Sequence, residues 1–139
     1  MAIVDKARTF IGVITEYGGA PYSRTRADCS EYLWRVLGKP KHHAGKWWGT
    51  DAIFTDAKKT QSEFVEIDKA DVRPGDMAVY PSHRDSAGKG HQGHVAIITD
   101  PAAHKIIDCS QSQNGVHEHV DLLAHFWTKP DAIFIRYKG

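Results

Sequence analysis

The run RADCSEYLW, residues 26–34, is the point where a polar turn gives way to a helical pattern. Its cysteine, Cys29, is expected on the first turn of that helix. There the unpaired backbone N–H groups and the positive end of the helix dipole favour the thiolate over the thiol. Because the thiolate is the nucleophilic form of cysteine, the run predicts a reactive cysteine at the start of a helix.

A histidine and a carboxylate follow in the order that a cysteine–histidine–acid triad can use. His94 lies in GHVAII, residues 93–98, and Asp108 ends IID, residues 106–108. A thiol nucleophile needs a base with a pKa near neutrality and a third group that orients the imidazole. Antiparallel pairing of the two segments would bring His94 and Asp108 within hydrogen-bonding reach. With the backbone N–H of Cys29 as part of an oxyanion hole, the pattern predicts a cysteine hydrolase.

Length and composition indicate one globular domain, residues 1–139. Hydrophobic residues make up 41% of the chain and charged residues 25%, as is usual for a packed domain. The net charge of +1 gives no electrostatic reason to expect a nucleic-acid partner. Two cysteines do not make a disulfide framework. Pairing of Cys109 with Cys29 stays open, but burial of Cys109 in its apolar stretch is favoured.

The first residues, MAIVDKAR at positions 1–8, show neither a long apolar stretch nor a cleavage-site pattern. No segment of the sequence is long and apolar enough to span a bilayer. We therefore expect a chain that is made in the cytoplasm without a visible signal peptide. Any action outside the cell would then need another export route or a leader that has been trimmed away.

Helices are expected in the first half of the chain. Apolar residues recur at helical spacing over residues 4–14, which predicts a first helix. A second helix should begin at residue 29 or 30 and end at residue 37, closed by Gly38. A short third helix is expected over residues 51–59, with Thr50 as its N-cap.

The second half of the chain predicts strands separated by turns and by a polar loop over residues 82–93. RPGD, residues 73–76, is a turn signal. Strands are expected at residues 77–80, 94–99, 105–110, 116–120 and 133–137. Helices followed by short sequential strands predict an α+β fold with an antiparallel sheet.

Three motifs in this order resemble the NlpC-type cell-wall cysteine peptidases: Asp28-Cys29-Ser30 opening a helix, the turn at residues 73–76, and Gly93-His94-Val95-Ala96-Ile97. The resemblance extends from Ala7 to about Val116. It implies a papain-like fold in which N-terminal helices pack on a central antiparallel sheet. It also implies cleavage of peptidoglycan stem peptides, between D-glutamate and the following diamino acid, without a cofactor.

Carried over by position, the resemblance makes Cys29 the nucleophile, His94 the general base and Asp108 the third polar residue, a position that is usually histidine. Tyr22 matches the aromatic residue that seats the free amino end of the substrate. Asp28 and Ser30, on either side of the nucleophile, are also expected to contact substrate. The family commonly has glycine after Asp-Cys-Ser, whereas this chain has Glu31, which places an additional carboxylate near the nucleophile.

Two adjacent tryptophans, Trp47 and Trp48, lie in a predicted loop flanked by glycines. They are candidates for an aromatic wall of the substrate groove. The alternative is that one packs on the core while the other is partly exposed.

The nine histidines raise the question of a metal site. Their spacings, such as His91-x-x-His94 and His117-x-His119, fit no standard zinc pattern. On a strand, His117 and His119 would share one face, and solvent exposure is the simpler account of them. We therefore expect no metal.

Two other functions remain open at the level of the sequence. Transglutaminase-like enzymes and acyltransferases also order cysteine, histidine and aspartate this way and could act on another amide. A non-catalytic binding domain with a vestigial site is the third interpretation. If the substrate is peptidoglycan, an antibacterial effector or a phage lysin would fit a small enzyme without a visible leader, and an effector would need a cognate inhibitor (immunity) protein as partner.

Overall fold

The computed structural model of the chain describes residues 2–12, 14–15, 26–110, 115–121 and 126–139. The helical elements are α1 (Ile3–Arg8), α2 (Cys29–Leu37), α3 (Thr50–Thr55), the π-helix η1 (Asp56–Thr60) and the 3-10 helix η2 (Lys69–Asp71). The strands are β1 (Ile14–Thr15), β2 (Arg26–Ala27), β3 (His42–His43), β4 (Lys46–Trp47), β5 (Phe64–Ile67), β6 (Met77–Tyr80), β7 (His83–Arg84), β8 (Gly90–His91), β9 (His94–Asp100), β10 (Lys105–Ser110), β11 (Gly115–Val120) and β12 (Ile133–Tyr137).

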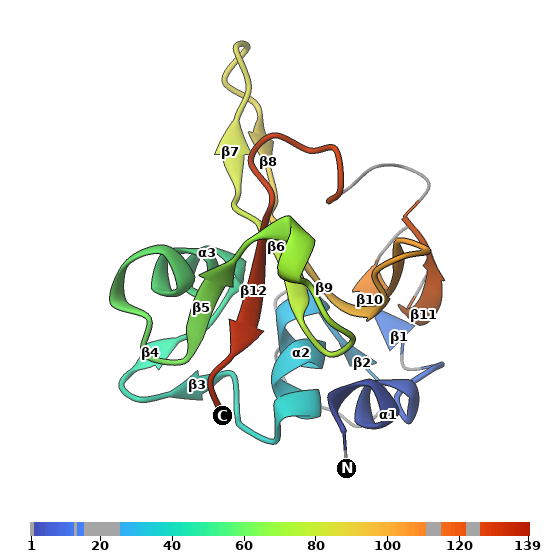
Figure 1. Cartoon of the computed structure of the whole chain (residues 1–139). Helices are drawn as coiled ribbons and strands as arrows, with labels where there is room; N and C mark the ends of the chain where they lie inside the picture. The colour runs from blue at the N-terminus through green and yellow to red at the C-terminus, as the bar shows by residue number, and fades with distance from the viewer. Residues whose placement is uncertain (1, 13, 16–25, 111–114, 122–125) are drawn as a thin grey trace.

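The centre of the molecule is a six-stranded sheet in the order β11-β10-β9-β6-β12-β5 (Figure 1). Every neighbouring pair in it is antiparallel. Strands β9 and β10 lie next to each other through the short connection at residues 101–104, so the segments that carry His94 and Asp108 are neighbours in the sheet. The predicted α+β class, with helices first and antiparallel strands after them, is confirmed.

One face of the sheet packs against α1, α2 and α3 around Trp34, which is fully buried. The Trp34 indole N–H donates to the Trp48 carbonyl oxygen at 2.9 Å. Its ring makes edge contacts with Trp48, Phe64 and Tyr137. Aromatic pairs of this kind stabilise beyond the area that they bury. This cluster fixes α2 against the sheet and with it the position of Cys29.

The opposite face of the sheet is covered by the C-terminal segment. Phe126, Trp127 and Phe134 pack there on Ile98 and Ile106. Strand β9 is therefore buried on both faces, with only its two ends accessible. His94 is the first residue of β9, at the end where a side chain can reach both solvent and the core.

Helix α2 begins and ends where the sequence predicts. Asp28 is the N-cap, and its carboxylate accepts a hydrogen bond from the Glu31 backbone N–H at 2.7 Å. This bond satisfies one of the first-turn donors. Gly38 closes the helix in the left-handed region at φ 79°, which is the conformation that favours glycine.

The predicted turn at residues 73–76 joins two strands of the sheet. Its Asp76 carboxylate accepts the Arg73 backbone N–H at 2.8 Å. It also accepts two hydrogen bonds from the Arg136 guanidinium in β12, each of 2.8 Å. A bidentate pair of this kind fixes geometry as well as adding stability. The motif therefore holds β6 in register beside β12.

Two helix predictions are wrong in their bounds. The first helix ends at Arg8 instead of about residue 14, because the Thr9 hydroxyl donates to the Lys6 carbonyl and Gly12 follows at φ 98°. In the third helix the N-cap is Gly49, and Thr50 is the first helical residue. The segment continues as the π-helix η1 instead of a single α-helix over residues 51–59.

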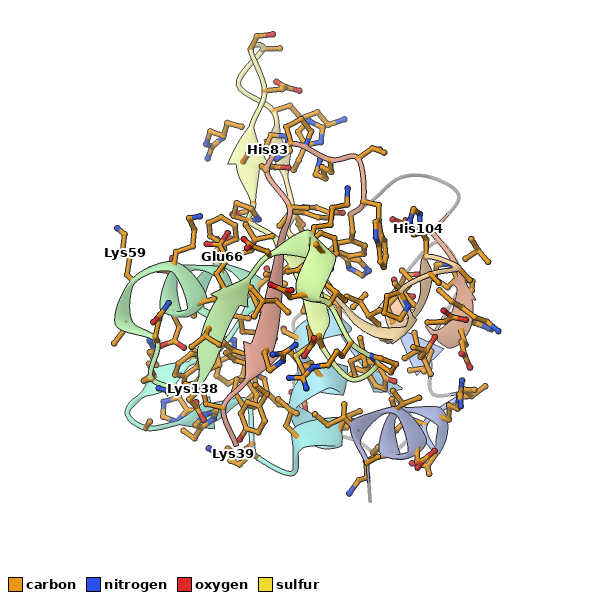
Figure 2. All side chains as sticks on the ribbon, viewed as in Figure 1. Lys39, Lys59, Glu66, His83, His104 and Lys138 are labelled. Atoms are coloured by element: carbon orange, nitrogen blue, oxygen red, sulfur yellow. The ribbon has the colours of Figure 1, made fainter. Side chains whose placement is uncertain are left out.

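The predicted loop at residues 82–93 contains a short hairpin, β7–β8, that projects from the body of the molecule (Figure 1). Figure 2 shows His83 on this hairpin, away from the sheet. The His83 and His91 rings stack at 4.8 Å across it, and His91 Nε2 lies 2.9 Å from the Asp85 carboxylate. Both strands of the hairpin are exposed. In the described parts of the chain, the helices are all too short or too polar to cross a bilayer.

Candidate active site

Cys29 is the first residue of α2 and is partly buried against the helix-side core. Asp28 caps this helix, and the first-turn N–H groups, which have no partner within the helix, lie at the same helix end as the thiol. The position predicted for the cysteine, at the start of a helix and at the edge of the core, is the position found. It is one that supports nucleophilic chemistry.

His94 lies between Cys29 and Asp108. Its Nε2 is 2.6 Å from Asp108 Oδ2, and its side chain is 15% exposed. Burial alone would lower the pKa of His94, but side-chain hydrogen bonds with Asp108 and Cys29 raise it to about 10. Since Nε2 is engaged by the carboxylate, Nδ1 is the ring nitrogen left for the thiol. The three residues that the sequence singled out are therefore brought together.

Asp108 is almost completely buried, at 2% exposure, yet it is ionised. Burial would raise its pKa, but hydrogen bonds from His119 and His94 lower the pKa to about 2. His119 Nε2 is 2.8 Å from Asp108 Oδ1, so each carboxylate oxygen is held by a different imidazole. The sequence interpretation of His119 as a solvent-exposed histidine is wrong, because the register of β10 and β11 directs it toward Asp108.

Two aromatic rings enclose His94. Phe126 stacks on its imidazole at 5.9 Å with an interplanar angle of 24°, and Tyr80, its partner on β6, lies at 6.3 Å. Burial, together with the nearby Cys29 and Asp108, raises the pKa of Tyr80 to about 12, so its hydroxyl stays neutral. Phe126 and Tyr80 were not identified from the sequence. They hold the imidazole in an apolar surrounding where its bond to Asp108 is strong.

A cavity of about 220 Å³ opens beside the thiol. Its lining consists of residues 28–30, Lys41, residues 49–50, Ser82 and residues 92–93. The Asp51 carboxylate accepts both the backbone N–H and the hydroxyl of Ser82, at 2.8 and 2.6 Å. These bonds tie α3 to the base of the β7–β8 hairpin and shape one wall of the cavity. The cavity is the space in which a substrate amide could approach Cys29.

The predicted substrate residues Asp28 and Ser30 both line this cavity. The Ser30 hydroxyl donates to Asp28 Oδ1 at 3.1 Å. The buried Lys41 ammonium, which sequence reasoning missed, donates to both Asp28 oxygens at 3.2 and 2.9 Å. A buried carboxylate requires such a partner. Asp28 therefore has a structural role, whatever contact it makes with substrate.

Glu31, the residue that departs from the family pattern, turns along α2 and away from the thiol. It is 5% exposed, and its carboxylate lies 3.5 Å from the guanidinium Nε of Arg35, one helical turn further on. Burial raises its pKa, although Arg35 opposes the rise. The additional carboxylate that the sequence places near the nucleophile is thus held within a buried ion pair.

The two tryptophans have different environments. Trp48 is 1% exposed and stacks on His43 at 5.3 Å, so its predicted place in the wall of the groove is wrong and it belongs to the core. Trp47 is 52% exposed. The Lys41 ammonium lies 5.2 Å from the Trp47 ring, beside a second hollow of about 590 Å³. Tyr22, the predicted seat for the amino end of the substrate, falls outside the described residues.

Within the described residues, no group of three or more histidine, cysteine, aspartate or glutamate side chains could hold a metal ion. The active-site residues instead hydrogen-bond to one another. The arrangement of thiol, imidazole and carboxylate can perform acyl transfer through a covalent intermediate.

Comparison with solved structures defines the fold. NlpC1 of Trichomonas vaginalis superposes with a TM-score of 0.59 at 16% identity over 94% of this chain and 41% of that protein. NlpC2 of the same organism gives 0.54 at 18% identity over 96% of this chain and 45% of that protein. The NlpC/p60 domain of the peptidoglycan hydrolase SagA gives 0.54 at 20% identity, covering 95% of this chain and 94% of that domain. The papain-like α+β fold is confirmed, and the chain spans less than half of the two NlpC proteins.

Residues 17–120 match the family model of the CHAP domain. The match covers most of the chain and includes Cys29, His94, Asp108 and His119. The protein belongs to the CHAP domain family, and the resemblance to NlpC-type cell-wall peptidases inferred from the sequence is confirmed. No curated protein sequence matches the chain.

Proposed function

We propose that this protein is a cysteine peptidase or amidase that hydrolyses an amide bond in peptidoglycan stem peptides. One observation carries the proposal: Cys29 opens a helix beside His94, and the far nitrogen of that imidazole is held by the ionised Asp108 at 2.6 Å. Membership of the CHAP family and a fold shared with the NlpC/p60 domain of a peptidoglycan hydrolase support the substrate class.

The first half of the reaction transfers the acyl group to the enzyme. The Cys29 thiolate attacks the amide carbonyl carbon, and the Cys29 backbone N–H at the helix start stabilises the oxyanion. The protonated His94 then donates its proton to the departing amine as the C–N bond breaks. A thioester on Cys29 and a free amine result. Asp108 contributes by holding His94 in the orientation and protonation state that this transfer needs.

The second half releases the acid. Neutral His94 accepts a proton from a water molecule as that water attacks the thioester carbonyl. The S–C bond breaks, the carboxylic acid departs, and the proton on His94 restores the thiolate–imidazolium pair. The raised pKa of His94 keeps its imidazole protonated across the neutral range, ready for the next cycle.

The bond that we propose is the one between D-glutamate and the following diamino acid. Its support is the resemblance of residues 28–30, 73–76 and 93–97 to the NlpC-type motifs. The cavity beside the thiol has a volume of about 220 Å³, and its charged groups, Asp28 and Lys41, form an ion pair with each other. Such a site suits a peptide backbone better than a highly charged group.

The test is mass analysis of purified muropeptides after incubation with wild type, Cys29→Ala and Cys109→Ser. Cys109 is buried in the core and serves as the matched cysteine control. Wild type and Cys109→Ser should release the peptide beyond D-glutamate, whereas Cys29→Ala should leave the substrate intact. Activity that survives Cys29→Ala would overturn the mechanism, and intact muropeptides with wild type would overturn the substrate.

Adding a primary amine to the same assay distinguishes the acyl-transfer alternative. A transglutaminase-like enzyme would give products heavier by the amine, whereas a hydrolase gives the free acid. The effector or lysin role, and the cognate inhibitor protein, stay predictions from the sequence. Co-purification of the tagged protein with a second protein, identified by mass, would test the inhibitor.

A further inference from the structure

The buried Asp108 carboxylate forms a hydrogen bond with a different imidazole at each of its two oxygens. His94 Nε2 lies 2.6 Å from Asp108 Oδ2, and His119 Nε2 lies 2.8 Å from Oδ1. His119 reaches Asp108 diagonally, because its own partner across the β10–β11 ladder is Ile106 and that of Asp108 is His117. The three side chains therefore share one face of the sheet. A chain of contacts runs from Cys29 through His94 and Asp108 to His119.

The hydrogen bonds of His119 determine its charge. Its second nitrogen, Nδ1, lies 3.3 Å from the Val120 carbonyl oxygen. A backbone carbonyl and an ionised carboxylate can only accept hydrogen bonds, so both ring nitrogens must carry protons when both bonds are made. His119 is then an imidazolium. The hydrogen bond with Asp108 also raises the pKa of His119, which agrees with this assignment.

We propose that His119 is a positioning residue, which as an imidazolium holds the second oxygen of Asp108 and so fixes the carboxylate that orients His94. The proposal extends the function proposed above, in which Asp108 acts through His94. A carboxylate held at one oxygen can rotate about its Cβ–Cγ bond, whereas one held at both oxygens cannot. The orientation of His94 toward Cys29 thus depends on a residue that touches neither thiol nor substrate.

The other charged groups near His119 leave this role intact. Asp121, one residue beyond Val120, adds a smaller favourable effect on the charged imidazole. His117 lies on the same face, opposite Asp108. Glu118 points to the other face, where Arg8 binds it at 2.9 Å. Asp108 is therefore the anion on which His119 acts.

Two substitutions separate positioning from a general loss of stability. His119→Ala removes both the donor and the charge, whereas His119→Gln places an amide N–H at a similar reach and restores the hydrogen bond without the charge. His117→Ala, on the same strand and the same face, is the matched control. All are measured for kcat and KM on muropeptides across pH, and for the rate of Cys29 alkylation by iodoacetamide across the same range.

His119→Ala should lower kcat about 10-fold or more with little change in KM, since small misplacements of a catalytic group cost that much. In this variant the high-pH side of the profile (the alkaline limb), for both activity and alkylation, should move to lower pH. The reason is that His94 loses a well-placed carboxylate. His119→Gln should recover most of kcat and hold the alkaline limb at or above that of wild type. His117→Ala should behave like wild type.

Each other result overturns the proposal. A reduced kcat with an unmoved alkaline limb would mean that His119 only stabilises the fold, and an effect equal to that of His117→Ala would mean that it does nothing specific. The alkylation profile needs no substrate. If wild type leaves muropeptides intact while His119→Ala still shifts that profile, the substrate proposal fails and the positioning role stands.

Discussion

Replacing Asp108 by asparagine tests the electrostatics of the site most sharply. The two side chains have nearly the same shape, so Asp108→Asn removes the charge while preserving the packing around a residue that is 2% exposed. The asparagine oxygen can accept one hydrogen bond, but its amide nitrogen must then face the second imidazole. Both His94 and His119 lose the anion that favours their protonated forms.

The size of the effect follows from the pKa of His94. Its rise from 6.5 to about 10 occurs against burial, which alone would lower it. A difference of that size corresponds to roughly 5 kcal/mol in favour of the imidazolium, shared between Asp108 and Cys29. If Asp108 supplies about half, the pKa of His94 falls by roughly 2 in the variant. The alkaline limb of activity should then move from near pH 10 to near pH 8.

The assay is kcat/KM on muropeptides from pH 5 to 11, together with iodoacetamide alkylation of Cys29 over the same range. At neutral pH we expect Asp108→Asn to lose about 100-fold or more in kcat, because asparagine also favours the wrong imidazole tautomer. An alkaline limb that stays within about half a pH unit of wild type would refute the assignment of Asp108 as the partner of His94.

Three further predictions concern stability. Gly93→Ala places a Cβ 2.5 Å from a backbone carbonyl oxygen, so the free energy of unfolding, measured in urea, should fall by about 1–3 kcal/mol. Gly90→Ala is the control, because its Cβ meets nothing within 4 Å, and it should leave the stability unchanged. Equal effects of the two substitutions would contradict the close approach at Gly93. Lys41→Met leaves the buried Asp28 carboxylate without its ion-pair partner and should lower the free energy of unfolding by about 3 kcal/mol in the same assay. An unchanged unfolding midpoint would show that the ion pair is dispensable. Because folding raises the pKa of His94, protonated His94 stabilises the fold fully below about pH 6.5, and this contribution is lost as the pH rises to about 10. The midpoint of thermal unfolding should therefore fall across that pH window. A midpoint that does not change with pH there would contradict the raised pKa.

Much of the fold could be predicted because local signals and the global fold agree. Asp28 and Gly38 mark the two ends of α2, and the preference of these residue types for helix ends can be recognised in the sequence. The strands around His94 and Asp108 are apolar runs separated by a short turn, so their pairing follows from proximity along the chain. The closeness of His94 to Asp108 could be predicted for the same reason.

The rest depended on contacts that a sequence does not reveal. The path of the chain from η1 into β5 is fixed by the buried Asp56 carboxylate, which accepts the backbone N–H groups of residues 62–64. Trp47 and Trp48 are neighbours with opposite environments, which only packing decides. His119 could have been suspected, since it lies on the same face as Asp108 once β10 and β11 pair, but the register of that hairpin was needed to see it.

Trapping the covalent intermediate is the most direct test of the central claim that Cys29, oriented by His94 and Asp108, performs acyl transfer on a stem peptide. Wild type is mixed with excess muropeptide, quenched in acid within milliseconds to seconds, and its intact mass measured. We predict an adduct equal in mass to the portion ending at D-glutamate, mapped to the peptide that contains Cys29 and missing in Cys29→Ala. Turnover without any such adduct, or an adduct on another residue, would contradict the account.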